Sequence, residues 1–494
     1  MAILTINLGL QTSQLTFAPP AKLSDLLMLA DASVGQPCGG RGVCGKCAVL
    51  LTGNISDATP SEARLNCRLA CQATILGDAS VTLPALHTHH IQAGAQHQLT
   101  PHSPMPGKYG TTIDIGTTTL VLQLRDLATG ALLGCASMLN PQTSVSADVI
   151  GRIDAACKGR LRELQNQVAS AIHALLTTVC AQAEISPDAI ASFVITGNTT
   201  MLYLLNGRSP VCLGRAPFHA DCLFGNEHAT EKKTIYFPPC LQAFIGADTT
   251  CAILASGMLE RTETALLCDV GTNGELALWH KGQLYIASTA AGPAFEGAGI
   301  SCGCGSIDGA IDRVDLLNGI TYCHTLGNQP AVGICGSGLL DAIAVMLDSG
   351  VLDESGAMDE PVFLLREQIM LTQADIRAVQ LAKAATYAGI QTMLDAANCT
   401  EDDVSTLYLA GGFGSHLNLR SAARIGLLPA TLAMKAKVIG NAALDGAAQL
   451  LLNTSRRADL TALQGKCMHV RLDGNPAFAE RYIDAMLFPE EGDM

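Results

Sequence analysis

Three cysteines stand close together near the beginning of the chain, in the segment Cys38-Gly-Gly-Arg-Gly-Val-Cys44-Gly-Lys-Cys47. Cysteine thiolates are the usual ligands of iron–sulfur clusters, and a 2Fe-2S cluster takes four of them. The glycines between these cysteines allow positive φ angles, so the backbone can wrap closely around a bulky inorganic core. The segment therefore predicts three ligands of a 2Fe-2S cluster, and either Cys67 or Cys71 supplies the fourth.

A structural zinc ion is the other metal that clustered cysteines commonly hold. Structural zinc sites usually combine two separated pairs of the Cys-x-x-Cys type. This chain instead has one glycine-rich triplet followed by a second cysteine-bearing segment. We therefore favour an iron–sulfur cluster over zinc.

Two later segments carry residues suited to phosphate and Mg2+. Each is an apolar strand that ends in an aspartate and a Gly-Thr turn: Thr111-Thr-Ile-Asp114-Ile-Gly116-Thr117-Thr118-Thr119 and Leu266-Leu-Cys-Asp269-Val-Gly271-Thr272-Asn273. Backbone N–H groups and hydroxyls at such turns bind phosphate oxygens, and a carboxylate binds hydrated Mg2+. A third segment, Leu407-Tyr-Leu-Ala-Gly411-Gly412-Phe413-Gly414, is an apolar strand that runs into a double glycine.

The elements that would position the cysteines lie within residues 1–85, which have the pattern of a small α+β domain. Ser24 is a plausible N-cap for a helix that continues through Leu29. The strands are expected near residues 3–8, 14–17, 47–52 and 70–75, the first two forming a hairpin. Their order resembles the β-grasp fold of 2Fe-2S ferredoxins.

The cysteine spacing, C-x5-C-x2-C, has one residue more than the plant-type ferredoxin pattern. It resembles the adrenodoxin-like branch of the ferredoxins, whose fourth cysteine lies in an Arg-Leu-small-Cys-Gln segment. Arg68-Leu-Ala-Cys71-Gln72 matches that segment. The resemblance implies that the cluster ligands are Cys38, Cys44, Cys47 and Cys71, with Cys67 as the spare.

Residues 86–108 differ in composition from the segments on either side. They carry five of the twelve histidines and three prolines, without hydrophobic periodicity. A histidine metal site is the alternative, but nothing in the pattern would fix the side chains in place. We expect a flexible linker.

The order of the two aspartate turns and the double glycine resembles the ATPase fold shared by acetate and sugar kinases, Hsp70 and actin (ASKHA). In that superfamily two duplicated α/β domains clamp ATP. The resemblance predicts such a fold for residues 109–494, with lobes at about 109–265 and 266–494. It implies that the first turn takes the γ-phosphate side, the second turn the β-phosphate side and the double glycine the adenosine. The residues assigned to Mg2+ and ATP are then Asp114, Gly116, Thr117, Thr118, Thr119, Asp269, Gly271, Thr272, Asn273, Gly411, Gly412 and Phe413.

Three further residues receive roles from the same superfamily. Asp248 precedes the second turn, where the superfamily often has an acidic residue near the attacking water; the alternative is that it caps the following helix. Thr372-Gln-Ala-Asp375 predicts a capping box that opens a helix through about Ala396. Gln380 and Lys383 lie on this helix, whose superfamily equivalent touches adenine; the alternative is a solvated helical face.

The composition of the whole chain argues against some classes of binding partner. The 494 residues are 48% hydrophobic, only 4% are aromatic, and the formal net charge is −14. Few aromatic residues and a negative charge disfavour binding to nucleic acid. There is no apolar run of 18 residues, and the 19 cysteines are scattered among apolar residues. We therefore expect a cytoplasmic protein with neither a membrane span nor a disulfide framework.

The fusion of a ferredoxin domain to this ATPase fold resembles the reductive activators of corrinoid proteins, which serve anaerobic methyltransferase and O-demethylase systems. Further segments that resemble blocks of that family are 148–153, 197–201, 292–297, 333–338, 412–417, 425–429 and 440–443. The resemblance implies ATP-dependent, one-electron reduction of cob(II)alamin to cob(I)alamin on a corrinoid protein. A ferredoxin or a flavin reductase would be the upstream electron donor. Larger members have an additional domain before the first turn, associated with dimerisation, so the oligomeric state stays open.

Three other functions are compatible with parts of the pattern. An activator of a 2-hydroxyacyl-CoA dehydratase has the same ATPase fold but binds a 4Fe-4S cluster between two subunits, and only Cys302-Gly-Cys304 is a local pair for it. A nucleotide-binding redox regulator without turnover is disfavoured by the intact Asp114 and Asp269. A small-molecule kinase with a redox switch would phosphorylate an added sugar or acid.

Overall fold

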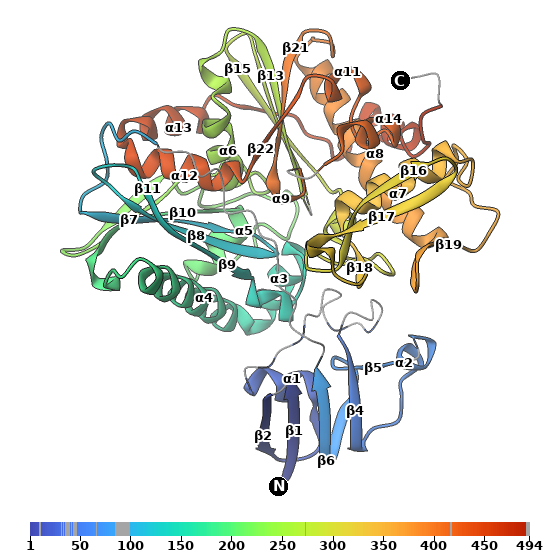
Figure 1. Cartoon of the computed structure of the whole chain (residues 1–494). Coiled ribbons are helices and arrows are strands. Elements are labelled where there is room, and N and C mark those ends of the chain that lie inside the picture. Colours follow the sequence, from blue (N-terminus) through green and yellow to red (C-terminus); the bar gives the residue numbers. More distant parts are fainter. Residues whose placement is uncertain are drawn as a thin grey trace. The chain divides into compact units, whose positions relative to one another are not determined.

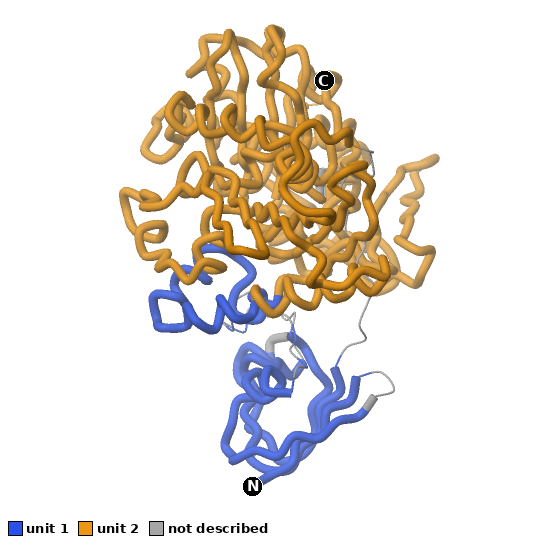
Figure 2. Tube along the Cα trace, turned by 90° about the vertical axis from the view of Figure 1, so that its left-hand side faces the viewer, with its two compact units in different colours: residues 1–88, 141–167 blue, residues 89–140, 168–494 orange. Residues whose placement is uncertain are grey.

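The computed structural model describes all residues except 9–10, 31, 33, 35–39, 41, 43–46, 66, 84–98, 272, 415–416 and 491–494 (Figure 1). Cys38, Cys44 and Thr272, which the sequence assigned to the cluster and to ATP, therefore lie outside the described residues. Figure 2 shows two compact units. One comprises Met1–Thr88 and Pro141–Gln167, and the other comprises His89–Asn140 and Val168–Met494.

The N-terminal part of the first unit contains one mixed sheet. Strands β1 (Ala2–Leu8), β2 (Gln11–Phe17), β3 (Ala21–Lys22), β4 (Ala48–Ile55), β5 (Arg68–Leu69) and β6 (Thr74–Leu83) have the order β2-β1-β6-β4-β5, with β3 paired to β6. The central pair, β1 and β6, is parallel, whereas β1–β2 and β4–β6 are antiparallel. The helices of this part are α1 (Leu23–Leu29) and α2 (Pro60–Leu65). This mixture of strands and helices agrees with the α+β prediction for residues 1–85.

The predicted N-cap at Ser24 is wrong, because α1 begins at Leu23 and has Lys22 at its N-cap. No side-chain cap is needed there. The N–H groups of Leu23 and Ser24 donate to the carbonyl oxygens of Ala73 and Ala70 at 3.0 Å each. The chain after β5 thus takes over the role of a capping side chain.

The core of this part joins α1 to the sheet. Leu4, Leu27 and Val81 have no exposed surface, and Cys47 and Cys71 belong to the same buried cluster. The two cysteines therefore lie on the inner side of the domain. The second segment of this unit contains η1 (Pro141–Ser144), α3 (Val149–Ala155), η2 (Ala156–Arg160) and the beginning of α4 (Leu161–Gln182).

The second unit contains two six-stranded sheets built on one plan, with the orders β11-β12-β10-β7-β8-β9 and β22-β21-β13-β14-β15-β23. In each sheet, three consecutive strands form an antiparallel meander. A fourth strand pairs in parallel with the first strand of the meander, and a fifth pairs in parallel with the fourth. This repetition confirms the predicted duplicated α/β fold. The strands are β7 (Tyr109–Ile115), β8 (Thr119–Asp126), β9 (Leu132–Leu139), β10 (Ile190–Gly197), β11 (Asn226–Ala229), β12 (Thr234–Phe237), β13 (Thr264–Val270), β14 (Gly274–His280), β15 (Gln283–Thr289), β21 (Val404–Ala410), β22 (Ala436–Gly440) and β23 (Met468–His469).

Helices cover both sheets (Figure 1). On the first sheet they are α5 (Thr199–Leu205), α6 (Ala247–Ser256) and α12 (Ala442–Leu452). The remaining helices are α7 (Gly336–Asp348), α8 (Gln373–Ala396), α9 (Gly411–Gly414), α10 (Leu419–Arg424), α11 (Ala430–Ala433), α13 (Arg457–Gln464) and α14 (Pro476–Asp484). Smaller sheets are formed by β16 (Ala310–Leu317), β17 (Ile320–Thr325) and β18 (Gly333–Ile334), and by β19 (Val362–Arg366) and β20 (Ile369–Thr372). None of the helices in the described ranges is long and apolar enough to cross a bilayer.

Helix α12 comes from the last part of the sequence but packs against α6, β7 and β10 of the first sheet. By its place in the sequence this helix belongs to the predicted second lobe, 266–494, but it packs within the first, 109–265. The linker prediction is also wrong for residues 99–108. There Met105 is buried and its N–H donates to the carbonyl of Leu451 at 2.9 Å, while Ser103 Oγ donates to Asn453 Oδ1 at 2.9 Å.

The segment after α14 is anchored on α8. Phe488 is only 2% exposed, belongs to the core of the second lobe, and lies under Lys383, whose Nζ is 4.9 Å from the ring centroid. Gln380 Nε2 donates to the carbonyl of Met486 at 2.7 Å, and Lys383 Nζ donates to that of Leu487. Because Lys383 is buried, its pKa is lowered to about 7.

Phe488→Ala should loosen this attachment. Removing a buried phenylalanine ring usually costs about 3–5 kcal/mol, and here it also uncovers the Lys383 ammonium. We expect a lower thermal midpoint and faster hydrogen exchange within α8. Leu487→Ala is the matched control, because that side chain is 53% exposed and its contact is made by the backbone. Equal effects of the two substitutions would contradict the anchoring role.

Candidate functional site

A cavity of about 400 Å3 in the second unit is lined by residues of both sheets. It brings together the three segments that the sequence assigned to ATP. The lining includes Asp114, Gly116, Thr117, Thr118, Thr119, Asp248, Asp269, Gly271, Asn273, Gly411 and Gly412. Phe413 lies on α9, directly after the double glycine.

The first turn joins β7 to β8 and is held closed by its own backbone. The N–H of Gly116 donates to the carbonyl of Thr119 at 2.9 Å. A Cβ at Gly116 would lie 2.7 Å from that carbonyl oxygen, which explains the glycine. From α5, Asn198 Nδ2 donates to Thr117 Oγ1 at 3.1 Å. The turn therefore presents hydroxyls in a fixed arrangement.

The second turn and the double glycine are neighbours because β13 and β21 pair in parallel, with Asp269 opposite Ala410. Gly411 follows Ala410 and has a φ of 86°. A Cβ at Gly411 would lie 2.4 Å from Asp269 Oδ1. Glycine is thus required both by the backbone conformation and by the carboxylate beside it.

The three predicted aspartates share the cavity with two glutamates to which the sequence analysis gave no role, Glu275 and Glu296. Glu275 pairs with Asp269 across β13 and β14. Glu296 ends η5 (Pro293–Glu296), and its Oε2 accepts a hydrogen bond from Thr118 Oγ1 at 2.5 Å. No local signal in the sequence separates Glu296 from other glutamates.

Burial raises the pKa values of four of these carboxyls, and repulsion between carboxylates adds to the rise at Asp114, Asp269 and Glu275. Burial, then Asp248 and Asp269, raise the pKa of Asp114 to about 7, although a hydrogen bond from Asn441 opposes the shift. Burial, Asp248 and Glu296 raise the pKa of Asp269 to about 7, and burial raises that of Asp248 to about 6. The pKa of Glu275 is also well above its usual range, for the same reasons. Such a set of oxygen ligands fits Mg2+, whose charge would relieve the repulsion.

Asp248 lies in the first turn of α6, whose N-cap is Gly246. Its Oδ1 accepts from the N–H of Thr249 at 2.8 Å, and its side chain lines the cavity. The capping alternative is therefore not its main role, since the N-cap position belongs to another residue. A third residue to which the sequence gave no role, Asn441, caps α12 and donates from Nδ2 to Asp114 Oδ2 at 3.2 Å.

The capping box at Thr372 and Asp375 is confirmed, and α8 ends at the predicted Ala396. Gln380 and Lys383 do not line the cavity; they hold the C-terminal segment instead. The expected adenine contact of these two side chains thus finds no support in the structure. The helix was correctly predicted, but the segment that covers it was not.

The cysteine site lies in the first unit. Cys71 and Cys47 are both buried, and Cys71 forms a side-chain hydrogen bond with Cys47. That bond, with smaller contributions from Gln72 and the backbone of Gly42, lowers the Cys71 pKa to about 6 against the effect of burial. Burial and the nearby Glu62 instead raise the pKa of Cys67. The structure thus brings Cys71, the predicted fourth ligand, to Cys47.

Gln72 connects this pair to the cysteine loop. Its Nε2 donates to the carbonyl of Gly40 at 2.7 Å and lies 3.7 Å from Cys71 Sγ. Gly42 has a φ of 71°, and a Cβ there would lie 2.8 Å from Gln72 Cδ. Gly40 and Gly42 therefore lie against the side chain of Gln72.

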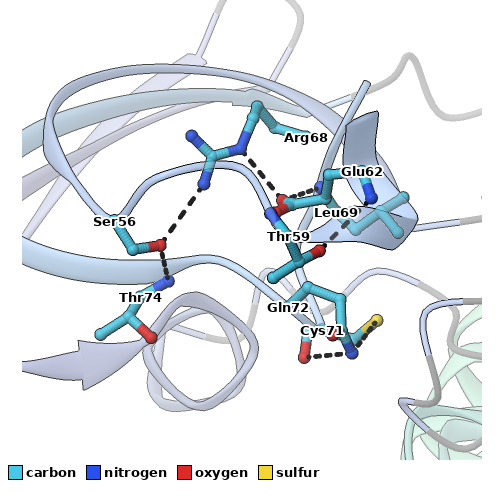
Figure 3. Close-up of polar contacts among 8 residues, drawn as sticks. All are labelled: Ser56, Thr59, Glu62, Arg68, Leu69, Cys71, Gln72 and Thr74. Atoms are coloured by element: carbon cyan, nitrogen blue, oxygen red, sulfur yellow. Dashed lines mark hydrogen bonds and ion pairs between the residues drawn. The ribbon is translucent and has the colours of Figure 1, made fainter. Parts of the chain in front are cut away.

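A buried carboxylate fixes the strand that leads to Cys71 (Figure 3). Glu62 is 1% exposed and accepts hydrogen bonds from the Leu69 N–H at 2.9 Å, Arg68 Nε at 3.0 Å and the Thr59 N–H at 2.8 Å. Burial alone would raise the pKa of Glu62, but these bonds hold it below its usual value. The sequence analysis missed Glu62, although Thr59 and Glu62 have the spacing of a capping box.

Comparisons with known proteins cover most of the chain. Residues 263–494 match a family model described as the C-terminal domain of RACo, the ASKHA domain, and residues 109–261 match the RACo middle region. The corrinoid activation enzyme RamQ of Eubacterium limosum is 35% identical over 419 residues, which are 77% of this chain and 70% of that enzyme. The Co(II) methylated amine-specific corrinoid protein reductase of Methanosarcina barkeri is 28% identical over 301 residues, 56% of this chain and 55% of that protein.

The solved structure of a reductive activator for corrinoid, iron-sulfur protein has a TM-score of 0.71 and 26% identity and covers 99% of both chains. The matched middle region contains the first of the two sheets.

Substitution of the two candidate cysteines should separate their roles. Cys71→Ser should abolish or severely distort a 2Fe-2S electron paramagnetic resonance signal, because it removes the thiol that meets Cys47. Cys67→Ser should leave the signal unchanged. The reverse result would assign the fourth ligand to Cys67, and a colourless zinc protein would contradict the cluster altogether.

Mg2+ binding to the carboxylate cavity should depend on pH. Carboxyls with pKa values of about 6 to 7 hold protons that Mg2+ must displace, so affinity should rise with pH up to about 8 and binding should release protons. Calorimetric titration in buffers of different ionisation enthalpy measures this release. Asp269→Asn should reduce both the affinity and the proton release. An affinity that is independent of pH would contradict the assignment.

Proposed function

The chain belongs to the family of reductive activators of corrinoid proteins, and from this we propose that it uses ATP hydrolysis to drive one electron onto the cob(II)alamin of a corrinoid protein, forming cob(I)alamin. The observation that carries the proposal is the single cavity in which both aspartate turns, the double glycine and Asp248 meet. The named relatives act on corrinoid proteins or activate them. ATP and Mg2+ are the substrate and cofactor that the ASKHA domain implies.

Each wall of the cavity has a part in ATP hydrolysis. The hydroxyls of Thr117, Thr118 and Thr119, with the remaining N–H groups of the turn, hold the terminal phosphate, and Gly271 and Asn273 hold the next one. Asp114 and Asp269 would hold Mg2+, which neutralises phosphate charge when bound. Gly411 and Gly412 leave room for adenosine.

Asp248 is the proposed base for the attacking water. Its pKa of about 6 leaves the carboxylate ionised at neutral pH and able to accept a proton. The Thr249 N–H fixes one of its oxygens. The water adds to the terminal phosphorus, the bond to the β-phosphate oxygen breaks, and ADP and phosphate leave.

The electron is proposed to pass through a 2Fe-2S cluster held by Cys38, Cys44, Cys47 and Cys71 in a ferredoxin-like domain. In plant-type ferredoxins such a cluster takes up one electron at a reduction potential of about −400 mV. Support comes from the buried Cys47–Cys71 pair and from the close passage of Gly42 over Gln72. An upstream ferredoxin or flavin reductase is the proposed donor.

The need for ATP follows from the difference in reduction potential between the electron donor and the cob(II)alamin that is reduced. A coupling free energy of ~5.5 kcal/mol shifts a two-state ratio from about 1:99 to about 99:1. For one electron, this shift of four decades corresponds to roughly 240 mV, at about 59 mV per decade. Closure of the two lobes around ATP is the proposed source of that coupling, acting through the environment of the cobalt.

The positions of Cys302 and Cys304 argue against the alternative function, the activation of a 2-hydroxyacyl-CoA dehydratase. Cys304 lines the nucleotide cavity, whereas Cys302 Sγ lies 3.8 Å from the carbonyl of Gln368. A 4Fe-4S site at this pair is therefore disfavoured.

The assay is the reduction of a cob(II)alamin corrinoid protein by the pre-reduced chain, followed in the visible spectrum. We expect full conversion with Mg-ATP and only the small yield that the cluster potential allows without it. Asp114→Ala should keep the cluster signal but lose the ATP-dependent yield. Cys71→Ser should keep ATP hydrolysis but lose reduction. Equal conversion with and without ATP, at a donor potential too weak for cobalt, would contradict the coupling.

A further inference from the structure

Glu296 occupies an unusual position in the nucleotide cavity. Its Oε2 accepts a hydrogen bond of 2.5 Å from Thr118 Oγ1 of the first turn. Its Oε1 is 3.5 Å from the point where a Cβ on Gly271 of the second turn would lie. One carboxylate thus stands between the two turns that the fold uses for phosphate.

A carboxylate in this place resembles a phosphate to the groups around it. It bears negative charge and offers oxygen acceptors to a threonine hydroxyl, which has a single proton to donate. Thr118 can therefore serve Glu296 or a terminal phosphate, but not both. Two anions in a buried cavity also repel each other strongly.

We propose that Glu296 occupies the place of the terminal phosphate in the nucleotide-free protein and is displaced when a nucleoside triphosphate binds. The Thr118–Glu296 hydrogen bond then is a latch between the lobes, since Thr118 follows β7 of the first sheet and Glu296 follows β15 of the second. A diphosphate does not reach the first turn and leaves the latch in place. This inference rests on the proposed ATP-dependent function.

The segment that carries Glu296 lies between two glycines with positive φ angles. Gly292 and Gly297, on either side of η5, have φ angles of 79° and 76°. Phe295 between them is 2% exposed and belongs to the core of the second lobe. Displacement of Glu296 therefore requires the glycines to change conformation or Phe295 to shift.

Such a shift reaches two helices of the second lobe. The helix η5 packs against α7 and α8. Farther along, the Ser301 N–H donates to Asp375 Oδ1 in the first turn of α8 at 2.7 Å. The first residues of α7, Gly336 and Ser337, line the same cavity. A shift of η5 would therefore be passed to α7 and α8 of the second lobe.

The competing role for Glu296 is that of a permanent Mg2+ or water ligand, and the two roles predict opposite effects on binding. Glu296→Gln keeps the shape of the side chain but removes its charge, which weakens the bond to Thr118 and the repulsion of phosphate. If Glu296 is a latch, the variant should bind a triphosphate more tightly. If it is a Mg2+ ligand, the variant should bind the Mg-triphosphate more weakly.

The experiment compares the full-length parent, Glu296→Gln and Thr118→Val in calorimetric titrations with Mg2+ plus a non-hydrolysable ATP analogue, and with Mg-ADP. Glu296→Gln should gain roughly tenfold in affinity for the triphosphate, the scale of one charge-assisted hydrogen bond, and change little for ADP. Thr118→Val should lose affinity for the triphosphate only. Glu360→Gln removes one exposed glutamate charge from the same lobe and should match the parent.

Hydrogen exchange of the segment 292–303 is the second readout. The triphosphate analogue should change its exchange in the parent, whereas ADP should not. Weaker triphosphate binding by Glu296→Gln, equal gains for both nucleotides, or equal exchange with both nucleotides would overturn the latch. A parent protein that binds neither nucleotide would overturn the proposed ATP-dependent function itself.

Discussion

Repulsion among the carboxylates that line one cavity is the constraint on which the ATPase part of the structure depends. Asp114, Asp248, Asp269, Glu275 and Glu296 face one cavity. Burial and their mutual repulsion raise the pKa values of Asp114 and Asp269 to about 7. Such a cavity is unfavourable without protons or a cation. The fold maintains it because each carboxylate is fixed at the end of a strand or helix that packs on the opposite side in a large apolar core.

The duplicated sheets explain how residues far apart in sequence reach this cavity. Parallel pairing of β13 with β21 places Gly411 beside Asp269, and α12, which crosses back to the first sheet, brings Asn441 to Asp114. The cavity therefore exists only when both lobes and the crossing helix are assembled. A nucleotide bound there would lie against residues of both lobes.

The extent to which the sequence predicted this site differs from residue to residue. Asp114 and Asp269 were predictable because strand, aspartate and Gly-Thr turn are contiguous, so local pattern defines them. Asn441 and Glu296 were not, because their partners, Asp114 and Thr118, lie more than a hundred residues away in sequence. Cys71 was chosen over Cys67 from a five-residue motif, and its contact with Cys47 supports that choice.

The failures also have physical causes. Gln380 and Lys383 were placed near adenine because their helix was recognised, but nothing in the sequence showed that Met486 and Leu487 would cover them. Part of the predicted linker is fixed instead, because Met105 enters the apolar core beside α12. Ser24 was expected to cap a helix whose first N–H groups are already bonded to the carbonyls of Ala70 and Ala73. In each case a contact with residues far away in the sequence determined the structure, and the local sequence pattern did not indicate that contact.

ATP hydrolysis in the carboxylate cavity is proposed to drive the reduction of a corrinoid partner. The most direct test is the rate of ATP hydrolysis in the presence of the same corrinoid protein in two states. We expect the cob(II)alamin form to accelerate hydrolysis and the methylated form not to do so, because only the former is the substrate of the reduction. Equal rates with both forms, or a rate unchanged by either, would contradict it.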